Sequence, residues 1–146
     1  MSALRPILLV EDNQNDLVLT LSALKRSNLA NDIIVTRDGS EALDFLLRRG
    51  AYANREENAP IVVFLDLKMP KMDGLDVLQH MKADPSLQTI PVVMLTSSNQ
   101  EVDLVKSYRL GVNAYVVKPV DAKQFMDSVQ QLGLFWGIVN EPPPAR

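Results

Sequence analysis

The sequence contains no cysteine and only one histidine, His80. The lack of cysteine excludes disulfide bonds, a thiolate metal site and a cysteine nucleophile. A zinc site built from several histidines is excluded as well, so any bound metal would need oxygen ligands. His80 falls in a predicted helix, where we expect it on the solvent side.

Long apolar runs and a large excess of one charge are also missing. No run approaches the length of a membrane span, and Glu11 and Asp12 follow the first apolar run too early for a signal peptide. The net charge of −3 disfavours a broad basic surface for nucleic acid. With 146 residues, we expect one cytoplasmic domain at 1–140 and a Pro-rich tail at 141–146.

Short apolar runs alternate with segments of helical period. The runs, each a predicted strand, cover residues 7–10, 33–36, 61–65, 91–95 and 114–117. Helices are predicted after each, including 16–26, 101–110 and a last helix from about Asp121. This pattern predicts an α/β fold with a doubly wound, five-stranded parallel sheet in the flavodoxin-like strand order 2-1-3-4-5.

Polar residues stand at the ends of four predicted strands. Glu11 and Asp12 follow the first strand, Asp66 the third, Thr96 the fourth and Lys118 the fifth. The carboxyl ends of parallel strands meet at one edge of the sheet, where ligands bind. Carboxylates gathered there would repel one another without a cation, and Mg²⁺ suits oxygen ligands. The pattern favours a carboxylate nucleophile toward a phosphoryl donor, with Lys118 and Thr96 beside the phosphoryl oxygens.

A structural explanation competes with this interpretation at every position. An acidic residue after a strand commonly caps the next helix, which we expect for Asp16, Asp38, Asp73 and Asp121. A lysine at a strand end is usually solvated, and a threonine there is a good strand residue. The three acidic residues at the first and third strands differ, because these strands flank the predicted ligand crevice.

Several ordered motifs resemble the receiver domain of bacterial two-component response regulators. The resemblance covers residues 6–132. The motifs are Val10-Glu11-Asp12, the loop from Asp66 to Gly74, Leu95-Thr96-Ser97, Tyr115 three residues before Lys118, and Lys118-Pro119.

The resemblance implies a phosphorylation site. Asp66 would accept a phosphoryl group from the phosphohistidine of a sensor histidine kinase or phosphotransfer protein. Glu11, Asp12, Asp66 and the backbone carbonyl of Lys68 would hold Mg²⁺. The protein would not be an enzyme, since it would catalyse only its own phosphorylation and dephosphorylation.

The resemblance also implies a switch. Thr96 would move toward the new phosphoryl group, Lys118 would pair with its charge, and Tyr115 would swing into the vacated space. The peptide bond before Pro119 would be cis. Phosphorylation would shift the face formed by the fourth helix, fifth strand and fifth helix. Tyr115 is also explained as a half-buried strand aromatic, and both explanations are compatible.

Three residues bear on the lifetime of the active state. Ser97 stands where the family usually has alanine, and Lys68 and Ser98 occupy variable positions two residues after the acceptor and the threonine. Side chains at these positions tune the access of water to the phosphoryl group, so they affect how long it persists.

Two further segments favour a stand-alone regulator paired with a phytochrome. Residues 51–60 are predicted to form a polar, exposed loop. The last helix is expected to extend through Phe135, Trp136 and Val139, packing on its own domain or forming a homodimer interface. The loop and tail resemble the small response regulators of bacterial phytochromes, which implies a bacteriophytochrome as the kinase. With no output domain expected, the protein would signal by contact.

Replacing Trp136 by alanine tests the homodimer. We expect the sedimentation coefficient to shift toward that of a monomer, because an aromatic cluster would lose its largest side chain. A dimer unchanged by Trp136→Ala in analytical ultracentrifugation would remove the tail from the interface.

Three other classes of protein remain as alternatives. A haloacid dehalogenase-type phosphatase needs a second aspartate two residues after the nucleophile, where this chain has Lys68. A flavodoxin-like flavin carrier needs a Ser-, Thr- and Gly-rich loop after the first strand, where this chain has Glu-Asp-Asn-Gln-Asn-Asp. A phosphorylation-independent adaptor with a vestigial acidic site stays open.

Overall fold

Five parallel strands form one sheet in the order β2-β1-β3-β4-β5, as predicted. In the computed structural model, which describes residues 4–134, β1 lies between β2 and β3. Ile7 of β1 is opposite Ile33 of β2 on one side and Val62 of β3 on the other. The strands are β1 (Ile7–Val10), β2 (Ile33–Thr36), β3 (Val62–Asp66), β4 (Val92–Thr96) and β5 (Ala114–Val117).

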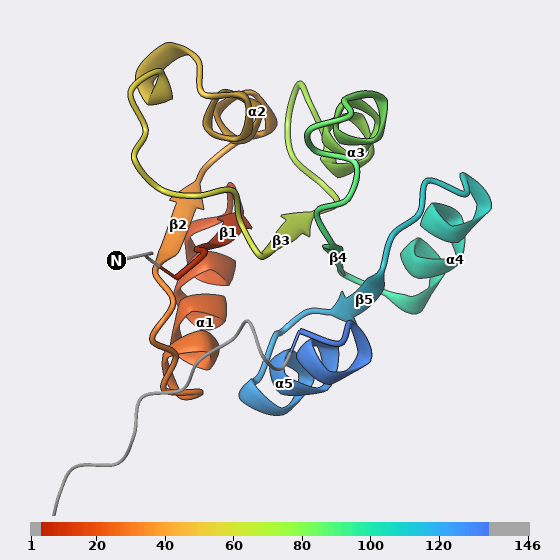
Figure 1. Cartoon of the computed structure of the whole chain (residues 1–146). Helices are drawn as coiled ribbons and strands as arrows, with labels where there is room; N and C mark the ends of the chain where they lie inside the picture. Colours follow the sequence, from red (N-terminus) through yellow and green to blue (C-terminus); the bar gives the residue numbers. More distant parts are fainter. Residues whose placement is uncertain (1–3, 135–146) are drawn as a thin grey trace, which may run out of the picture.

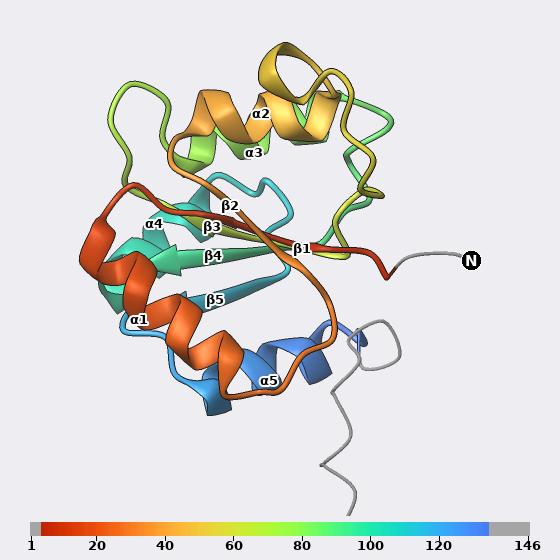
Figure 2. The same cartoon turned by 90° about the vertical axis from the view of Figure 1, so that its left-hand side faces the viewer.

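Helices cover both faces of the sheet (Figures 1 and 2). Helices α1 and α5 lie on one face, and α2, α3 and α4 lie on the other. They are α1 (Gln14–Lys25), α2 (Gly39–Leu47), α3 (Gly74–Ala83), α4 (Asn99–Ser107) and α5 (Ala122–Gln131), with a short 3₁₀ helix η1 (Gly50–Tyr52) after α2. None of the helices in the described range 4–134 is long and apolar enough to cross a membrane.

Two apolar cores explain why the strands lack polar alternation. In β1, Leu8 belongs to the core that includes Phe45 of α2, whereas Leu9 belongs to the core that includes Phe125 of α5. All four residues of β1 are fully buried. A strand covered by helices on both faces needs apolar residues at successive positions.

Strands β3 and β4 extend one residue beyond their predicted ends. Asp66 is therefore the last residue of β3 and Thr96 the last residue of β4. Asp66 pairs with Leu95 in the ladder, and the Leu67 amide donates to the Leu95 carbonyl at 2.9 Å. Both polar side chains thus start from the rigid sheet rather than from a loop.

Three of the four predicted helix caps are confirmed, and the fourth is wrong. Asp38, Asp73 and Asp121 cap α2, α3 and α5, as predicted. The expectation for Asp16 is wrong, since Asn13 caps α1 by accepting a hydrogen bond from the Asp16 amide. The helix begins earlier than predicted, and Asp16 moves into its first turn.

Helix α4 also begins earlier and ends sooner than predicted. Ser98 is its N-cap and accepts a hydrogen bond from the Glu101 amide. Arg109 has a φ of 52°, a left-handed conformation that does not continue a helix.

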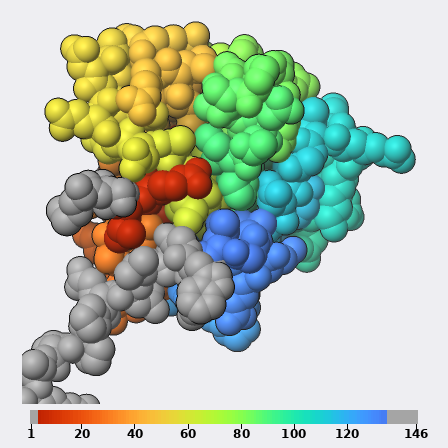
Figure 3. Space-filling model, viewed as in Figure 1, coloured from red at the N-terminus to blue at the C-terminus, as the bar shows by residue number. Residues whose placement is uncertain are grey.

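The connection after α2 is more ordered than the predicted exposed loop. Arg55 is buried, and its guanidinium donates to the Phe45 carbonyl at 2.7 Å and lies 4.4 Å from the centre of the Phe45 ring. Tyr52 packs edge-on against the same ring. Figure 3 shows this segment, in yellow, packed beside α2. The prediction of an exposed loop holds for Glu56 but fails at Arg55, whose long side chain covers apolar surface.

The described part of the last helix is shorter than expected. Helix α5 ends at Gln131, and Gly133 has a φ of 68°, so α5 does not run on as one helix through Leu134. The expected interface residues Phe135, Trp136 and Val139 lie outside the described residues. Their role in a homodimer stays a prediction.

Gly74 allows α3 to start directly against the end of β3. A Cβ atom at this position would lie 2.5 Å from the Asp66 carbonyl oxygen and 3.0 Å from Leu67 Cα, both backbone atoms. We expect Gly74→Ala to lower the free energy of unfolding by about 2 kcal/mol or more, because backbone must move to relieve the clash. Urea unfolding measures this change.

Gly133→Ala is the matched control. No atom of residues 4–134 lies within 4 Å of a Cβ placed there, so among these residues its cost comes from the positive φ alone. A smaller loss for Gly74→Ala than for Gly133→Ala would contradict the predicted clash.

Candidate functional site

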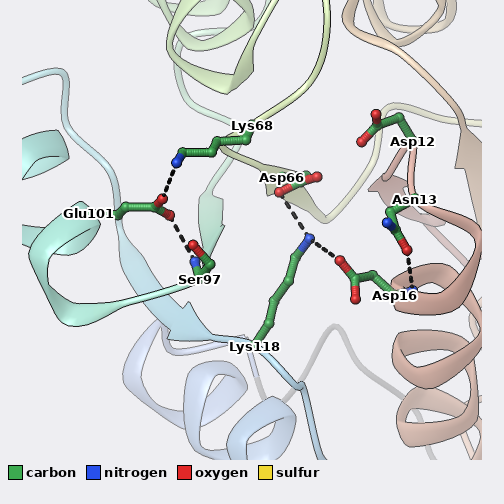
Figure 4. Close-up of a pocket in the computed structure, with 8 residues that line it drawn as sticks. All are labelled: Asp12, Asn13, Asp16, Asp66, Lys68, Ser97, Glu101 and Lys118. Atoms are coloured by element: carbon green, nitrogen blue, oxygen red, sulfur yellow. Dashed lines mark hydrogen bonds and ion pairs between the residues drawn. The ribbon is translucent and has the colours of Figure 1, made fainter.

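Four strand ends converge on one hollow at the edge of the sheet (Figure 4). Its volume is about 230 Å³. Side chains from β3, α1, α4 and the loops after β1, β3, β4 and β5 surround it. The lining residues are Asp12, Asn13, Asp16, Asp66, Lys68, Ser97, Glu101 and Lys118.

Three of the predicted carboxylates lie together. Glu11, Asp12 and Asp66 can each offer one oxygen, and these oxygens lie within 4.8 Å of one another. Glu11 is fully buried, Asp66 is 4% exposed, and Asp12 is half-buried. Carboxylate oxygens clustered beside an open hollow suit Mg²⁺, which typically binds one or two carboxylates and keeps some of its water ligands.

Lys118 balances part of this negative charge. Its Nζ lies 2.8 Å from Glu11 Oε1, 2.9 Å from Asp16 Oδ2 and 3.0 Å from Asp66 Oδ1. Burial of the ammonium group opposes its charge, but hydrogen bonds to Glu11 and Asp16 and the charge of Asp66 outweigh burial and raise the pKa of Lys118. Lys118 is therefore a fixed cation inside the site, not a solvated strand end.

Asp66 holds a proton more tightly than an ordinary carboxyl group. Burial is the main cause, and the hydrogen bond and the charge of Glu11 add to it, while Lys118 acts in the opposite direction. Together these effects raise the pKa of Asp66 from 3.8 to about 8. A divalent cation among the carboxylates would favour the ionised form.

This shift predicts how stability depends on pH in the absence of divalent cations. Because the folded state binds the Asp66 proton more tightly than the unfolded state does, its contribution to stability is complete below pH 4. That contribution disappears as the pH rises through about 8. We expect wild type to lose about 4 kcal/mol relative to Asp66→Asn between pH 5 and pH 9.

Urea unfolding of both proteins in chelator gives this difference directly. Parallel pH profiles for wild type and Asp66→Asn would show that Asp66 is already ionised near pH 5.

The remaining predicted residues lie in or directly after β4 and β5. Thr96 is buried, and its hydroxyl donates to the Ser98 carbonyl at 3.2 Å. Tyr115 is half-buried and packs against the core on the face of the sheet covered by α2, α3 and α4. Lys106 Nζ lies 5.4 Å from the centre of the Tyr115 ring. The peptide bond before Pro119 is cis, as expected.

The sequence analysis missed three residues that contact the site. Asp16 pairs with Lys118, and Glu101 pairs with Lys68 at 2.8 Å. Arg37 donates from Nε to the Glu11 carbonyl at 3.1 Å and from Nη2 to the Asp12 carbonyl at 3.0 Å. Recognising Asn13 and Ser98 as N-caps would have placed Asp16 and Glu101 in the first turns of α1 and α4, beside the site. No sequence signal marks Arg37.

The chain matches known proteins over nearly its whole length. The family model for the response regulator receiver domain matches residues 7–130. Response regulator Rcp1 of Synechocystis sp. is 42% identical over 130 residues, which are 89% of this chain and 87% of Rcp1.

Solved structures agree with this assignment. The bacteriophytochrome response regulator RtBRR is 60% identical with a TM-score of 0.90, over 97% of this chain and 86% of that chain. The Mn²⁺-bound form of Rcp1 is 40% identical with a TM-score of 0.72, over 97% of this chain and 99% of that chain. The phosphorylated cyanobacterial phytochrome response regulator RcpA is 41% identical with a TM-score of 0.73, over 92% of this chain and 94% of that chain.

These matches agree with the strand order and with the carboxylate cluster at the strand ends. Relatives at 40–60% identity include a bacteriophytochrome response regulator and a cyanobacterial phytochrome response regulator, and the chain therefore belongs to the response regulator receiver domain family of two-component systems.

Proposed function

We propose that the protein is a phosphorylation-dependent response regulator whose acceptor is Asp66. The observation that carries this proposal is that Asp66 lies close to both negative and positive groups. Its carboxylate clusters with those of Glu11 and Asp12 and lies 3.0 Å from the ammonium group of Lys118, which also contacts Glu11. A carboxylate placed among metal ligands and a fixed cation is suited to attack a phosphoryl donor.

The proposed step is an in-line transfer. A carboxylate oxygen of Asp66 forms a bond to phosphorus, the bond from phosphorus to the donor's imidazole nitrogen breaks, and the electron pair stays on the nitrogen. Glu11, Asp12, Asp66 and the Lys68 carbonyl would hold Mg²⁺, which neutralises charge on the transferring group when bound. Lys118 pairs with the phosphoryl oxygens and is already held at the site by Glu11 and Asp16.

Phosphorylation then changes contacts at the β5 edge of the sheet. The Thr96 hydroxyl exchanges its bond to the Ser98 carbonyl for a phosphoryl oxygen, and Tyr115 moves inward from its half-buried position. These changes alter the surface of α4, β5 and α5, through which the protein signals by contact with another protein.

A histidine kinase is the proposed donor. RtBRR is named a bacteriophytochrome response regulator and is 60% identical to this chain over 97% of this chain, which supports a bacteriophytochrome as the kinase. The structures of Mn²⁺-bound Rcp1 and phosphorylated RcpA support the same chemistry here, since both relatives are about 40% identical.

Intact-mass spectrometry with acetyl phosphate tests the proposal. We expect one phosphoryl adduct per chain when Mg²⁺ is present and none when a chelator replaces it, because the acidic cluster needs a cation for the dianionic donor to approach. Wild type that binds Mg²⁺ but accepts no phosphoryl group from acetyl phosphate or a histidine kinase would favour the phosphorylation-independent adaptor.

A further inference from the structure

Glu101 places a second carboxylate group in the hollow beside Asp66. The residue lies in the first turn of α4, and its side chain is only 12% exposed. One carboxylate oxygen lies 2.8 Å from Lys68 Nζ, and the other accepts a hydrogen bond from the Ser97 amide at 2.8 Å (Figure 4). Glu101 thus bridges the loop after β3 and the loop after β4.

These two partners are donors that a phosphoryl group on Asp66 would use. Lys68 and Ser97 line the same hollow as Asp66, and each follows a strand that ends in a site residue. Lys118 is already engaged by three carboxylates. Glu101 accepts the hydrogen bond of the Ser97 amide and pairs with Lys68, so an incoming anion has to compete with it for both donors.

Charge also opposes the coexistence of Glu101 with a phosphoryl group. The hollow is lined by the carboxylates Asp12, Asp16, Asp66 and Glu101 against two ammonium groups. A phosphoryl group adds up to two negative charges. Of the four carboxylates, Glu101 is the one carried by α4, on the side of the hollow opposite Asp12 (Figure 4).

We propose that Glu101 is a resident anion of the phosphoryl pocket, which phosphorylation of Asp66 displaces. This inference rests on the proposed function. Before phosphorylation, Glu101 slows entry of the donor and anchors the start of α4 to Ser97. After phosphorylation, Lys68 and the Ser97 amide turn to the phosphoryl oxygens, and the first turn of α4 loses that anchor. Displacement therefore links the chemistry at Asp66 to the position of α4.

Glu101→Gln tests the displacement. The amide oxygen of glutamine still accepts the Ser97 hydrogen bond, so capping of α4 is retained while the charge is removed. We expect the variant to be phosphorylated by acetyl phosphate with Mg²⁺ about three to ten times faster than wild type. Its affinity for beryllium fluoride, a noncovalent phosphoryl mimic, should increase by a similar factor.

Asp103→Asn is the matched control, because it removes a carboxylate from the exposed part of the same helix. We expect wild-type rates and affinities for it. A Glu101→Gln rate equal to or below that of Asp103→Asn would overturn the displacement while leaving the proposed function intact. Failure of wild type itself to bind beryllium fluoride or accept a phosphoryl group would instead overturn both.

The amide resonances of residues 99–102 provide a second measurement. Without any ligand, Glu101→Ala, which removes the acceptor for the Ser97 amide as well as the charge, should shift these resonances part of the way toward those of wild type bound to beryllium fluoride. Resonances that coincide with those of unliganded wild type would show that Glu101 does not link the pocket to α4.

Discussion

Asp66→Asn is expected to abolish phosphorylation by acetyl phosphate or a histidine kinase. The amide of asparagine has nearly the same shape as the carboxylate but lacks an oxygen that can attack phosphorus. The neighbouring Glu11 is fully buried and already paired with Lys118 at 2.8 Å, so it is poorly placed to replace the acceptor. Intact-mass spectrometry would therefore detect no adduct on the variant.

The loss should occur without unfolding. Asp66→Asn removes a buried charge beside Glu11, and we expect it to be as stable as wild type or more stable at pH 8 without divalent cations. Asp103→Asn should be phosphorylated like wild type. An Asp66→Asn protein that still carries one Mg²⁺-dependent phosphoryl group would assign the acceptor role to another carboxylate.

Lys118→Met is expected to slow phosphorylation of Asp66 by at least about a hundredfold. The ammonium group contacts Glu11, Asp16 and Asp66, and its side chain is only 14% exposed. Methionine fills similar volume but leaves these three carboxylates without their cation. The phosphoryl group then enters a more negative site and loses a charge-assisted hydrogen bond.

The rate is measured from the time course of the phosphoryl adduct at saturating Mg²⁺. Circular dichroism establishes whether Lys118→Met is folded under the same conditions. Lys123→Met is the control, because Lys123 is an exposed lysine on α5 that pairs only with Asp127 among the described contacts. A Lys118→Met rate within threefold of the Lys123→Met rate would exclude Lys118 from the transfer step.

Much of the fold could be predicted from the sequence because its signals are local. A strand buried on both faces must be apolar at successive positions, as Leu8 and Leu9 are on opposite faces of β1. Parallel strands joined by helices leave few topologies. That topology brings the carboxyl ends of β1 and β3 side by side, so the sequence pattern is sufficient to place Glu11 and Asp66 together.

Helix starts were less predictable because several neighbouring residues can act as caps. Asn13 and Ser98 cap α1 and α4, and each choice moves the helix start toward the strand before it. The shift carries Asp16 and Glu101 into first turns that face the hollow. Their partners Lys118 and Lys68 are distant from them in sequence, so no local pattern reveals the pairs.

The contacts of two arginines that lie outside the strand ends, Arg37 and Arg55, were not predictable either. Arg37 binds backbone carbonyls of Glu11 and Asp12, and any residue type could supply those acceptors. Arg55 looks like a surface residue in sequence, yet its planar guanidinium stacks on Phe45. Such positions depend on how separate segments pack.

Direct identification of the phosphorylated residue is the most decisive measurement. Borohydride reduces an aspartyl phosphate to homoserine, and peptide mass spectrometry then locates the converted residue. After incubation with acetyl phosphate, we predict homoserine at position 66 in the presence of Mg²⁺ and no conversion in chelator. Conversion at another aspartate, or none despite bound Mg²⁺, would contradict the assignment of Asp66 as the acceptor.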